Sequence, residues 1–341
     1  MPHSLYRSAR LGLIVLLLIG GFGLHLSAND LLVFEPAENN TNGKHIVLIS
    51  GDEEYRSEES CPMLAKILSQ HHGYRCTVLF AIDKATGYIN PYQIDNIPGT
   101  SSLATADLCI LATRWRTLPD DQMQPIFEYL QAGKPFISLR TATHAFKSGQ
   151  YGGYDWKNFG LNVIGENWHS HHGQHKVEGG RGVIVEKNAD HPILNDVSDI
   201  YTPSDIYGIA NLDQEAATVL LRGQVLKHLD PAAPPTAEKN DPMMPLAWLK
   251  DYTAPSGTKG QVFVTTAGAA VDFRSEDLRR LIVNASLFLT GEDVPLSAEV
   301  SFVDPFEPSF FGFVTGEAYL ERQLRPSDFG LGKATSVYPP Q

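Results

Sequence analysis

The densest group of residues that could do chemistry is a histidine-rich segment. His169, His171, His172 and His175 place four imidazoles within seven residues. Imidazole binds transition metals and exchanges protons near neutral pH. The spacing matches no zinc motif such as His-Glu-x-x-His. Three interpretations therefore stay open: a divalent metal site, acid/base or hydrogen-bonding work by one or two imidazoles, and a structural loop.

Other polar side chains directly follow apolar runs that we expect to be strands. In an open α/β sheet, ligands bind beyond the carboxyl ends of the strands, so such side chains should converge on one site. The side chains expected to bind substrate there are Asp52, Glu54, Tyr55, Arg114, Trp115, Trp168 and Tyr207. Each of them taken alone could instead be a solvated loop end or a core residue.

The turn at 139–144 is where hydrolases with related α/β folds place a nucleophile. It contains neither a cysteine nor a Gly-x-Ser-x-Gly motif, which argues against a covalent Ser or Cys mechanism. We expect Arg140 to hold hydroxyls or developing negative charge, and His144 and His172 to act as acid/base groups. Asp205, flanked by Tyr201 and Tyr207, is expected to orient a histidine or bind sugar hydroxyls, with a turn cap as the alternative.

The elements that must position these residues alternate between strands and helices. Continuously apolar strands are predicted at 45–50, 76–80, 107–113 and 135–139, and amphipathic helices at 57–70 and 119–130. This pattern predicts a parallel sheet covered on both faces, that is, a doubly wound α/β fold. Further strands are expected at 182–185, 217–221, 245–249 and 260–266, a capped helix at 275–289, and a long ordered loop at 151–174.

The N-terminus has the pattern of a signal peptide. Arg7 and Arg10 precede an apolar run at 11–24, and Leu26-Ser27-Ala28 offers a cleavage site after Ala28. We therefore expect residues 1–28 to be removed and the protein to be exported to the periplasm or outside the cell, without a stable membrane span. An uncleaved anchor is the alternative. The formal net charge of −12 and the absence of a basic run argue against nucleic-acid binding.

Three cysteines, an odd number, exclude a framework of several disulfides. Cys109 lies in an apolar run and is expected to be buried. Cys61 lies near the start of a predicted helix, where the helix dipole could lower a thiol pKa, although a structural role is the alternative.

Several motifs together resemble a known family. They are Ser50-Gly51-Asp52-Glu53-Glu54-Tyr55, the 136–144 turn, Asn167-Trp168-His169-Ser170-His171-His172-Gly173, Asp190-His191-Pro192, Ser204-Asp205-Ile206-Tyr207, Pro245-Leu246-Ala247-Trp248 and the 260–266 strand. Their order is similar to that in trehalose-utilisation (ThuA-like) proteins, over residues 44–291. The resemblance implies a flavodoxin-like, mostly parallel doubly wound sheet of the class I glutamine amidotransferase-like superfamily.

The resemblance also implies a role in sugar metabolism. The Cys-His-Glu triad of amidotransferases is not kept in this branch, and here Arg140 stands where the family usually has a histidine. We expect a protein that acts on a small sugar or sugar derivative, such as a keto-disaccharide, by acid/base chemistry without a cofactor. The alternatives are a non-catalytic sugar-binding envelope protein and a metal-dependent hydrolase built on the histidine segment. Residues 292–341 form a Phe/Pro-rich extension that we expect to pack on the domain or on a partner.

Overall fold

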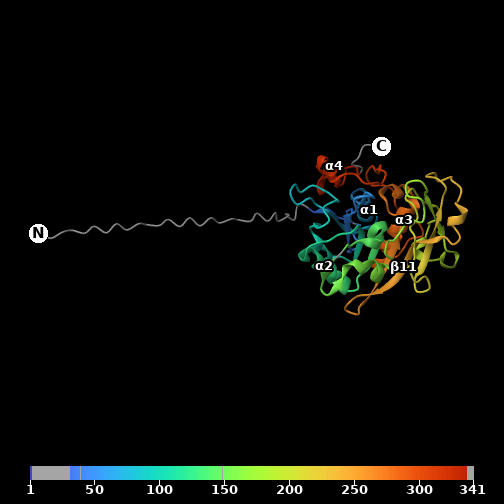
Figure 1. The fold of residues 1–341 in the computed structure, drawn as a ribbon, viewed down its shortest axis with the longest axis horizontal. Coiled ribbons are helices and arrows are strands. Elements are labelled where there is room, and N and C mark those ends of the chain that lie inside the picture. Colours follow the sequence, from blue (N-terminus) through green and yellow to red (C-terminus); the bar gives the residue numbers. More distant parts are fainter. Residues whose placement is uncertain (2–30, 39, 148, 336–341) are drawn as a thin grey trace.

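The computed structural model describes residue 1 and residues 31–38, 40–147 and 149–335 (Figure 1). The predicted signal peptide therefore lies almost entirely outside the described residues. Within the described part of the chain, no helix is both long enough and apolar enough to cross a bilayer.

The core of the described chain is a 10-stranded sheet with parallel strands at its centre. In spatial order the strands are β1 (Leu32–Phe34), β3 (Arg75–Phe80), β2 (His45–Gly51), β4 (Leu108–Thr113), β5 (Phe136–Leu139), β12 (Lys259–Thr265), β11 (Met244–Thr253), β10 (Thr218–Val225), β8 (Gly180–Ile184) and β9 (Ile200–Thr202). Neighbours from β3 to β12 pair in parallel. The strand β1 at one edge and the strands from β11 to β9 at the other pair antiparallel, so the sheet is mixed.

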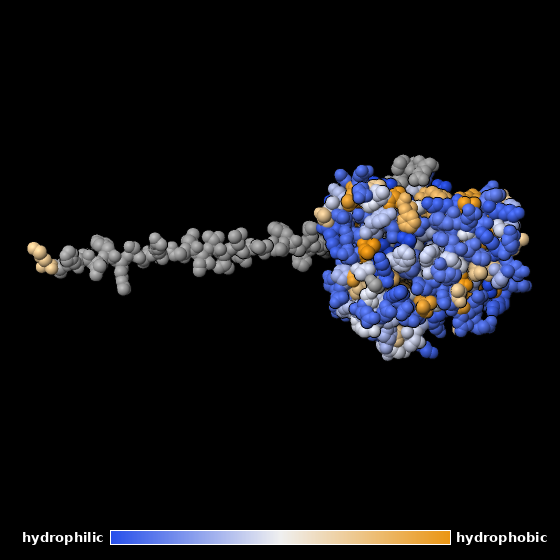
Figure 2. Space-filling model, viewed as in Figure 1, coloured by the Kyte–Doolittle hydropathy of each residue, from blue (hydrophilic) through white to orange (hydrophobic). Residues whose placement is uncertain are grey.

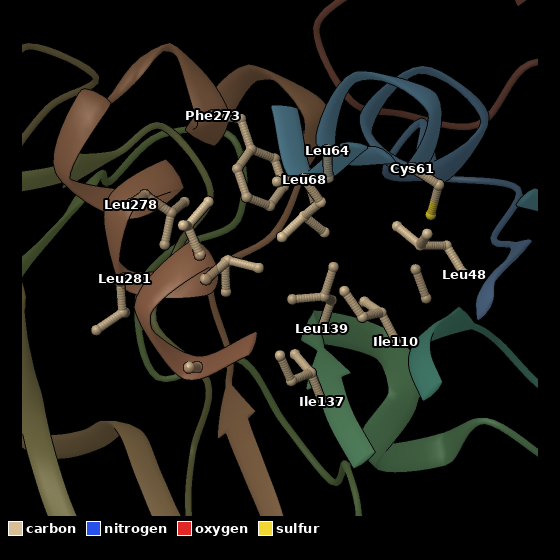
Figure 3. Close-up of a cluster of buried hydrophobic side chains, with 14 of the residues drawn as sticks. Leu48, Cys61, Leu64, Leu68, Ile110, Ile137, Leu139, Phe273, Leu278 and Leu281 are labelled. Atoms are coloured by element: carbon tan, nitrogen blue, oxygen red, sulfur yellow. The ribbon is translucent and has the colours of Figure 1, made fainter. Parts of the chain in front are cut away.

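The longer helices cover both faces of the parallel region. They are α1 (Ser57–His72), α2 (Asp120–Gln131) and α3 (Glu276–Thr290). Alternate residues of one strand face opposite sides, so Leu48 packs with α1 and α3 while Val47 packs on the α2 side. Figure 3 shows the first of these layers, with Leu64 and Leu278 above the strands. Two buried faces explain why these strands are apolar throughout, as the sequence predicted.

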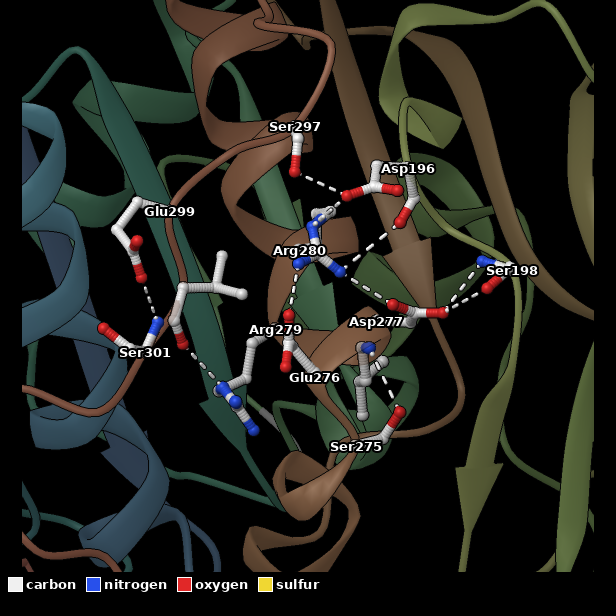
Figure 4. A network of polar contacts seen from close by, with 12 residues as sticks. Asp196, Ser198, Ser275, Glu276, Asp277, Arg279, Arg280, Ser297, Glu299 and Ser301 are labelled. Atoms are coloured by element: carbon white, nitrogen blue, oxygen red, sulfur yellow. Dashed lines mark hydrogen bonds and ion pairs between the residues drawn. The ribbon is translucent and has the colours of Figure 1, made fainter.

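Helix α3 begins at the predicted serine cap. The Ser275 hydroxyl accepts a hydrogen bond from the Leu278 amide at 3.3 Å. One turn later, Arg280 pairs with Asp277 and Glu276 of the same helix and with Asp196 of the loop before β9 (Figure 4). This network fastens α3 to the antiparallel half of the sheet.

The predicted loop at 151–174 contains some regular structure. It includes the small hairpin β6 (Gln150–Tyr151) and β7 (Tyr154–Asp155), and a π-helix at Gly160–Ile164. Gly160 packs against the backbone of Thr143 in the turn after β5, where a side chain would not fit. The loop is therefore part of the support of that turn.

The extension after residue 291 packs on the domain. It carries α4 (Gly316–Glu321), which lies near α1 in Figure 1. Phe329 stacks on Phe80 with 5.6 Å between ring centroids, and Asp304 pairs with the buried Lys66 at 2.6 Å. The sequence predicts that the extension packs on the domain or on a partner, and these contacts place it on the domain.

All three cysteines are free and buried. Burial raises the pKa of the Cys61 thiol, so the helix dipole does not make this cysteine reactive.

Candidate functional site

A pocket of about 330 Å³ lies beyond the carboxyl ends of the parallel strands. Loops after β2, β4 and β5 form part of its wall. The rest comes from residues 168–176, from Tyr207 and from Phe313 of the C-terminal extension. Its lining residues are Glu54, Tyr55, Arg114, His144, Trp168, His171, His175, Lys176, Tyr207 and Phe313. The polar loop ends therefore converge as the sequence predicted.

Asp205 is the centre of the polar contacts beneath this pocket. Its Oδ2 lies 2.6 Å from Nδ1 of His171, and its Oδ1 lies 2.9 Å from Nδ1 of His175. Burial alone would raise the pKa of Asp205, but the hydrogen bonds from both imidazoles and the charge of Arg140 together lower it. Asp205 is therefore an ionised hydrogen-bond acceptor.

The ionised carboxylate fixes the tautomer of His171. A carboxylate only accepts, so Nδ1 of His171 must carry the hydrogen, and in the neutral ring Nε2 keeps its lone pair. Among the described residues, Nε2 of His171 has no hydrogen-bond partner. The side chain is 28% exposed and lines the pocket. His171 is therefore an imidazole oriented by an ionised carboxylate, which is the relationship found in catalytic dyads.

His175 is held differently, because both of its ring nitrogens face carboxylates. Nδ1 contacts Asp205, and Nε2 lies 3.1 Å from Oε1 of Glu54. These two hydrogen bonds outweigh burial and raise the pKa of His175 to about 9. At neutral pH His175 is thus a cation beside His171.

Arg140 lies behind the pocket rather than in its wall. Its side chain is 1% exposed, and its guanidinium donates to the backbone carbonyls of Asp205 and Thr266 and to Oδ1 of Asp205. The rings of Tyr55 and Tyr207 lie at 4.1 and 4.3 Å from the guanidinium carbon. Arg140 therefore positions Asp205, and the structure gives it no access to a ligand in the pocket.

Two buried aspartates hold the loops that carry the site. Asp52 accepts hydrogen bonds from the amides of Glu54 and Tyr55 and from the Thr141 hydroxyl, which ties the loop after β2 to the turn after β5. Asp272 accepts hydrogen bonds from the amide and hydroxyl of Ser204, immediately before Asp205. The predicted ligand residue Asp52 is therefore a loop support that lies outside the pocket lining.

The histidine-rich segment is fastened to the strand-like segment that carries Asp205. His171 forms an antiparallel bridge with Tyr207, and the amide of His172 donates to the Ile206 carbonyl at 2.8 Å. Of the four histidines of the segment, His171 and His175 line the pocket. Nε2 of His172 lies 2.6 Å from the carbonyl of Lys239, and His169 contacts Ser170. The expected acid/base residue His172 thus lies outside the pocket lining.

His144 lines the pocket between two tryptophans. Its ring centroid is 5.2 Å from that of Trp115 and 5.4 Å from that of Trp168. Burial and the nearby charge of Arg114 lower the pKa of His144 to about 3. His144 is therefore neutral, and it can exchange hydrogen bonds with a ligand without carrying charge.

Of the four histidines considered as metal ligands, two come together. His171, His175 and Asp205 each offer a ligand atom, and these atoms lie within 4.8 Å of one another. Two imidazoles and a carboxylate are a donor set that suits zinc or non-haem iron. Asp205 was predicted as an orienting residue and not as a metal ligand.

Sequence reasoning missed three residues of the site. Lys176 and Phe313 line the pocket, and Phe311 packs against His175. Lys176 directly follows the histidine-rich segment, and Phe311 and Phe313 belong to the extension. The phenylalanine-rich composition of the extension predicts that it packs against other residues. It does not predict which part of the domain the extension contacts.

Comparison with known proteins gives the family. A family profile described as ThuA, trehalose utilisation, matches residues 47–289. The chain belongs to the ThuA family. This confirms the resemblance inferred from the order of the motifs. The extension of this ThuA-family chain lies beyond the matched residues.

Two solved structures are similar to this ThuA-family chain. A ThuA-like protein of Bacteroides uniformis is 12% identical, with a TM-score of 0.47, and the match covers 74% of this chain and 93% of that one. A ThuA-like protein of Parabacteroides merdae is 15% identical, with a TM-score of 0.43, over 73% and 91% of the two chains. A comparison with curated proteins finds no match to this sequence.

Proposed function

We propose that this ThuA-family protein acts on a small sugar or sugar derivative by acid/base chemistry, with His171 as the base. The observation that carries the proposal is the pair of Asp205 and His171 in the pocket wall, where Nε2 of His171 has no hydrogen-bond partner among the residues that the structure describes. The family's description supports a sugar as the class of substrate.

The composition of the pocket supports this class of substrate. Glu54, Arg114 and Tyr207 offer hydrogen-bond partners for hydroxyl groups, and the Trp168 ring offers an apolar surface. Its volume is at the small end of the range of roughly 300–1,000 Å³ that is typical of ligand sites. A single sugar ring is therefore the appropriate size of bound group.

The charges suit a proton transfer. Nε2 of His171 takes a proton from a sugar hydroxyl, or from the carbon beside a keto group, and Asp205 stabilises the imidazolium that forms. The His175 cation lies beside this pair, with ring centroids 4.6 Å apart, and favours negative charge that develops on the substrate. Arg140 acts as a positioning residue, and His144 supplies a neutral hydrogen-bonding group.

Turnover of a panel of disaccharides and their keto forms tests the proposal. His171→Ala should lower turnover by about 100-fold or more, because a general base contributes roughly 10²–10⁴. His172→Ala is the matched control, since this neighbouring imidazole lies outside the pocket lining. Equal turnover in both variants would exclude His171 as the base. Sugar binding without turnover in the wild type would favour the non-catalytic binding protein.

A metal-dependent hydrolase is the second candidate, because His171, His175 and Asp205 can converge on one ion. Such an ion would polarise a substrate oxygen or lower the pKa of a bound water. Elemental analysis of the purified full chain tests this, with His175→Ala beside the control His169→Ala. Metal in the control and none in His175→Ala would support the metal centre. Absence of metal from all three proteins, even after incubation with Zn²⁺, would exclude it.

Export to the periplasm or beyond remains part of the proposal, on the strength of the pattern at 1–28. Intact-mass analysis of the native protein tests it. A mature N-terminus at Asn29 is expected, and retention of Met1 on a membrane-bound chain would contradict cleavage.

A further inference from the structure

The extension reaches the pocket from outside the part of the chain that matches the family. The amide of Gly312 donates to the carbonyl of Glu54 at 2.8 Å, which places residues 311–313 beside the loop after β2. The family profile ends at residue 289. This side of the pocket is therefore formed by residues outside the part of the chain that matches the family profile.

Phe311 anchors the extension at the pocket. Its ring is 2% exposed and lies 5.3 Å from the rings of both Tyr55 and His175. Two residues earlier, the amide and hydroxyl of Ser309 both donate to the buried carboxyl group of Glu59, each at 2.8 Å. The chain on the N-terminal side of Gly312 is thus held by packing and by hydrogen bonds.

Phe313 projects from this anchor to the mouth of the pocket. It lines the pocket, yet 55% of it is exposed. The Arg114 guanidinium carbon lies 5.0 Å from the Phe313 ring centroid and 4.6 Å from that of Trp115, which is itself 36% exposed. Glu53 pairs with Arg114 at 2.5 Å and fixes this arrangement.

Two partly exposed aromatic rings beside a polar pocket form a surface suited to the apolar face of a sugar ring. Most of the molecular face in Figure 2 is hydrophilic, with hydrophobic residues in small patches. Leaving a large aromatic ring in water is unfavourable, and covering it contributes free energy to binding. Because the pocket is small, the second ring of a disaccharide would lie at its mouth, against this surface.

We propose that Phe313 forms a second sugar subsite, in which its ring stacks on the outer ring of a disaccharide whose inner ring occupies the pocket. The proposal rests on the proposed function, since it takes the pocket as a sugar site. In this proposal, the extension determines whether the protein prefers disaccharides to monosaccharides.

Calorimetric titration of the full chain with trehalose and with glucose as probes tests the subsite. Phe313→Ala should weaken trehalose binding by about twofold to tenfold, the size of one aromatic contact, and leave glucose binding unchanged. Phe313→Trp should restore trehalose binding. Leu331→Ala, which removes another exposed apolar side chain of the extension, is the control and should bind both sugars like the wild type.

Three results would overturn the subsite. If Phe313→Ala binds both sugars like the wild type while His171→Ala loses them, the pocket takes sugars and the subsite does not exist. If Phe313→Ala loses glucose and trehalose equally, Phe313 belongs to the inner site. If the wild type binds neither sugar nor any member of the disaccharide panel, the proposed function fails together with the subsite.

Discussion

The side chain of Arg140 contacts both the backbone carbonyl and the carboxylate of Asp205. Nη1 of Arg140 donates to the Asp205 carbonyl at 3.1 Å, and Nη2 lies 3.2 Å from Asp205 Oδ1. Both side chains are almost wholly buried, at 1% and 0% exposed. The positive charge is therefore used to keep a buried carboxylate ionised and oriented beneath two histidines.

Replacement of Arg140 should consequently lower the stability of the fold, and its main effect should not be the loss of a contact to the sugar. Arg140→Ala leaves the Asp205 charge buried without its guanidinium, and we expect the free energy of unfolding to fall by about 3–5 kcal/mol in urea titrations. Arg75→Ala, which breaks the exposed pair with Glu35, should cost about 1 kcal/mol or less. An Arg140→Ala protein as stable as the wild type that no longer responds to sugars would instead favour the ligand clamp expected from the sequence.

His175 should titrate well above the ordinary range of histidine. Its pKa is raised to about 9 by Asp205 and Glu54, and NMR titration of the ring protons should follow this value. Since the folded pKa is raised, the stabilisation from the charged ring is complete below about pH 6.5 and is lost as the pH rises through about 9. Glu54→Gln should lower the pKa of His175. A titration near 6.5 in both proteins would contradict the two-carboxylate arrangement.

The carboxyl group of Glu59 should make stability depend on pH in the weakly acidic to neutral range. Burial and the nearby Glu58 raise the pKa of Glu59 to about 8. The unfolded chain releases this proton near pH 4.5, so stability should fall as the pH rises from 4.5 towards 8, by up to about 1.4 kcal/mol per pH unit. Urea unfolding at several pH values should show a smaller slope in Glu59→Gln. The exposed Glu128→Gln is the control, and equal slopes in all three proteins would rule out the effect.

Gly160 should not tolerate a side chain. A Cβ atom there would overlap the carbonyl oxygen of Thr143 and lie 2.7 Å from that of Glu166. Gly160→Ala should therefore lower the free energy of unfolding by about 1–3 kcal/mol and disturb the turn that carries His144. Gly316→Ala, at the start of α4 with its nearest neighbour at 3.6 Å, should have little effect. Similar melting temperatures for the two variants would refute this packing.

The parallel half of the fold was predictable from sequence because its strands are buried on both sides. Residues of β2 such as Val47 and Leu48 pack in different layers, so the central residues 46–49 of the strand are all apolar. In the antiparallel half of the sheet, the apolar pattern of the sequence predicted the ends of the strands less well. Strand β11 continues to Thr253 through the partly exposed Lys250 and the exposed Asp251, and the prediction ended it at Leu249.

The candidate site was predictable as a region but not in its internal roles. Strand ends indicated that Glu54, Arg114 and His144 would meet. Sequence could not tell which histidines face inward, because this depends on the bridge between His171 and Tyr207. Nor could it tell how deep Arg140 lies. Its backbone has a positive φ of 40°, and its side chain lies between two tyrosine rings.

The burial of Cys61, Cys76 and Cys109 makes this chain a suitable background for site-directed labelling. A thiol reagent modifies exposed thiolates, and burial raises the pKa of each of these three thiols. A single cysteine introduced at Leu331, a residue 49% exposed on the extension, would therefore carry a fluorophore without removal of the native thiols. Energy transfer from the tryptophans to that fluorophore would then report whether the extension is packed on the domain in the intact protein.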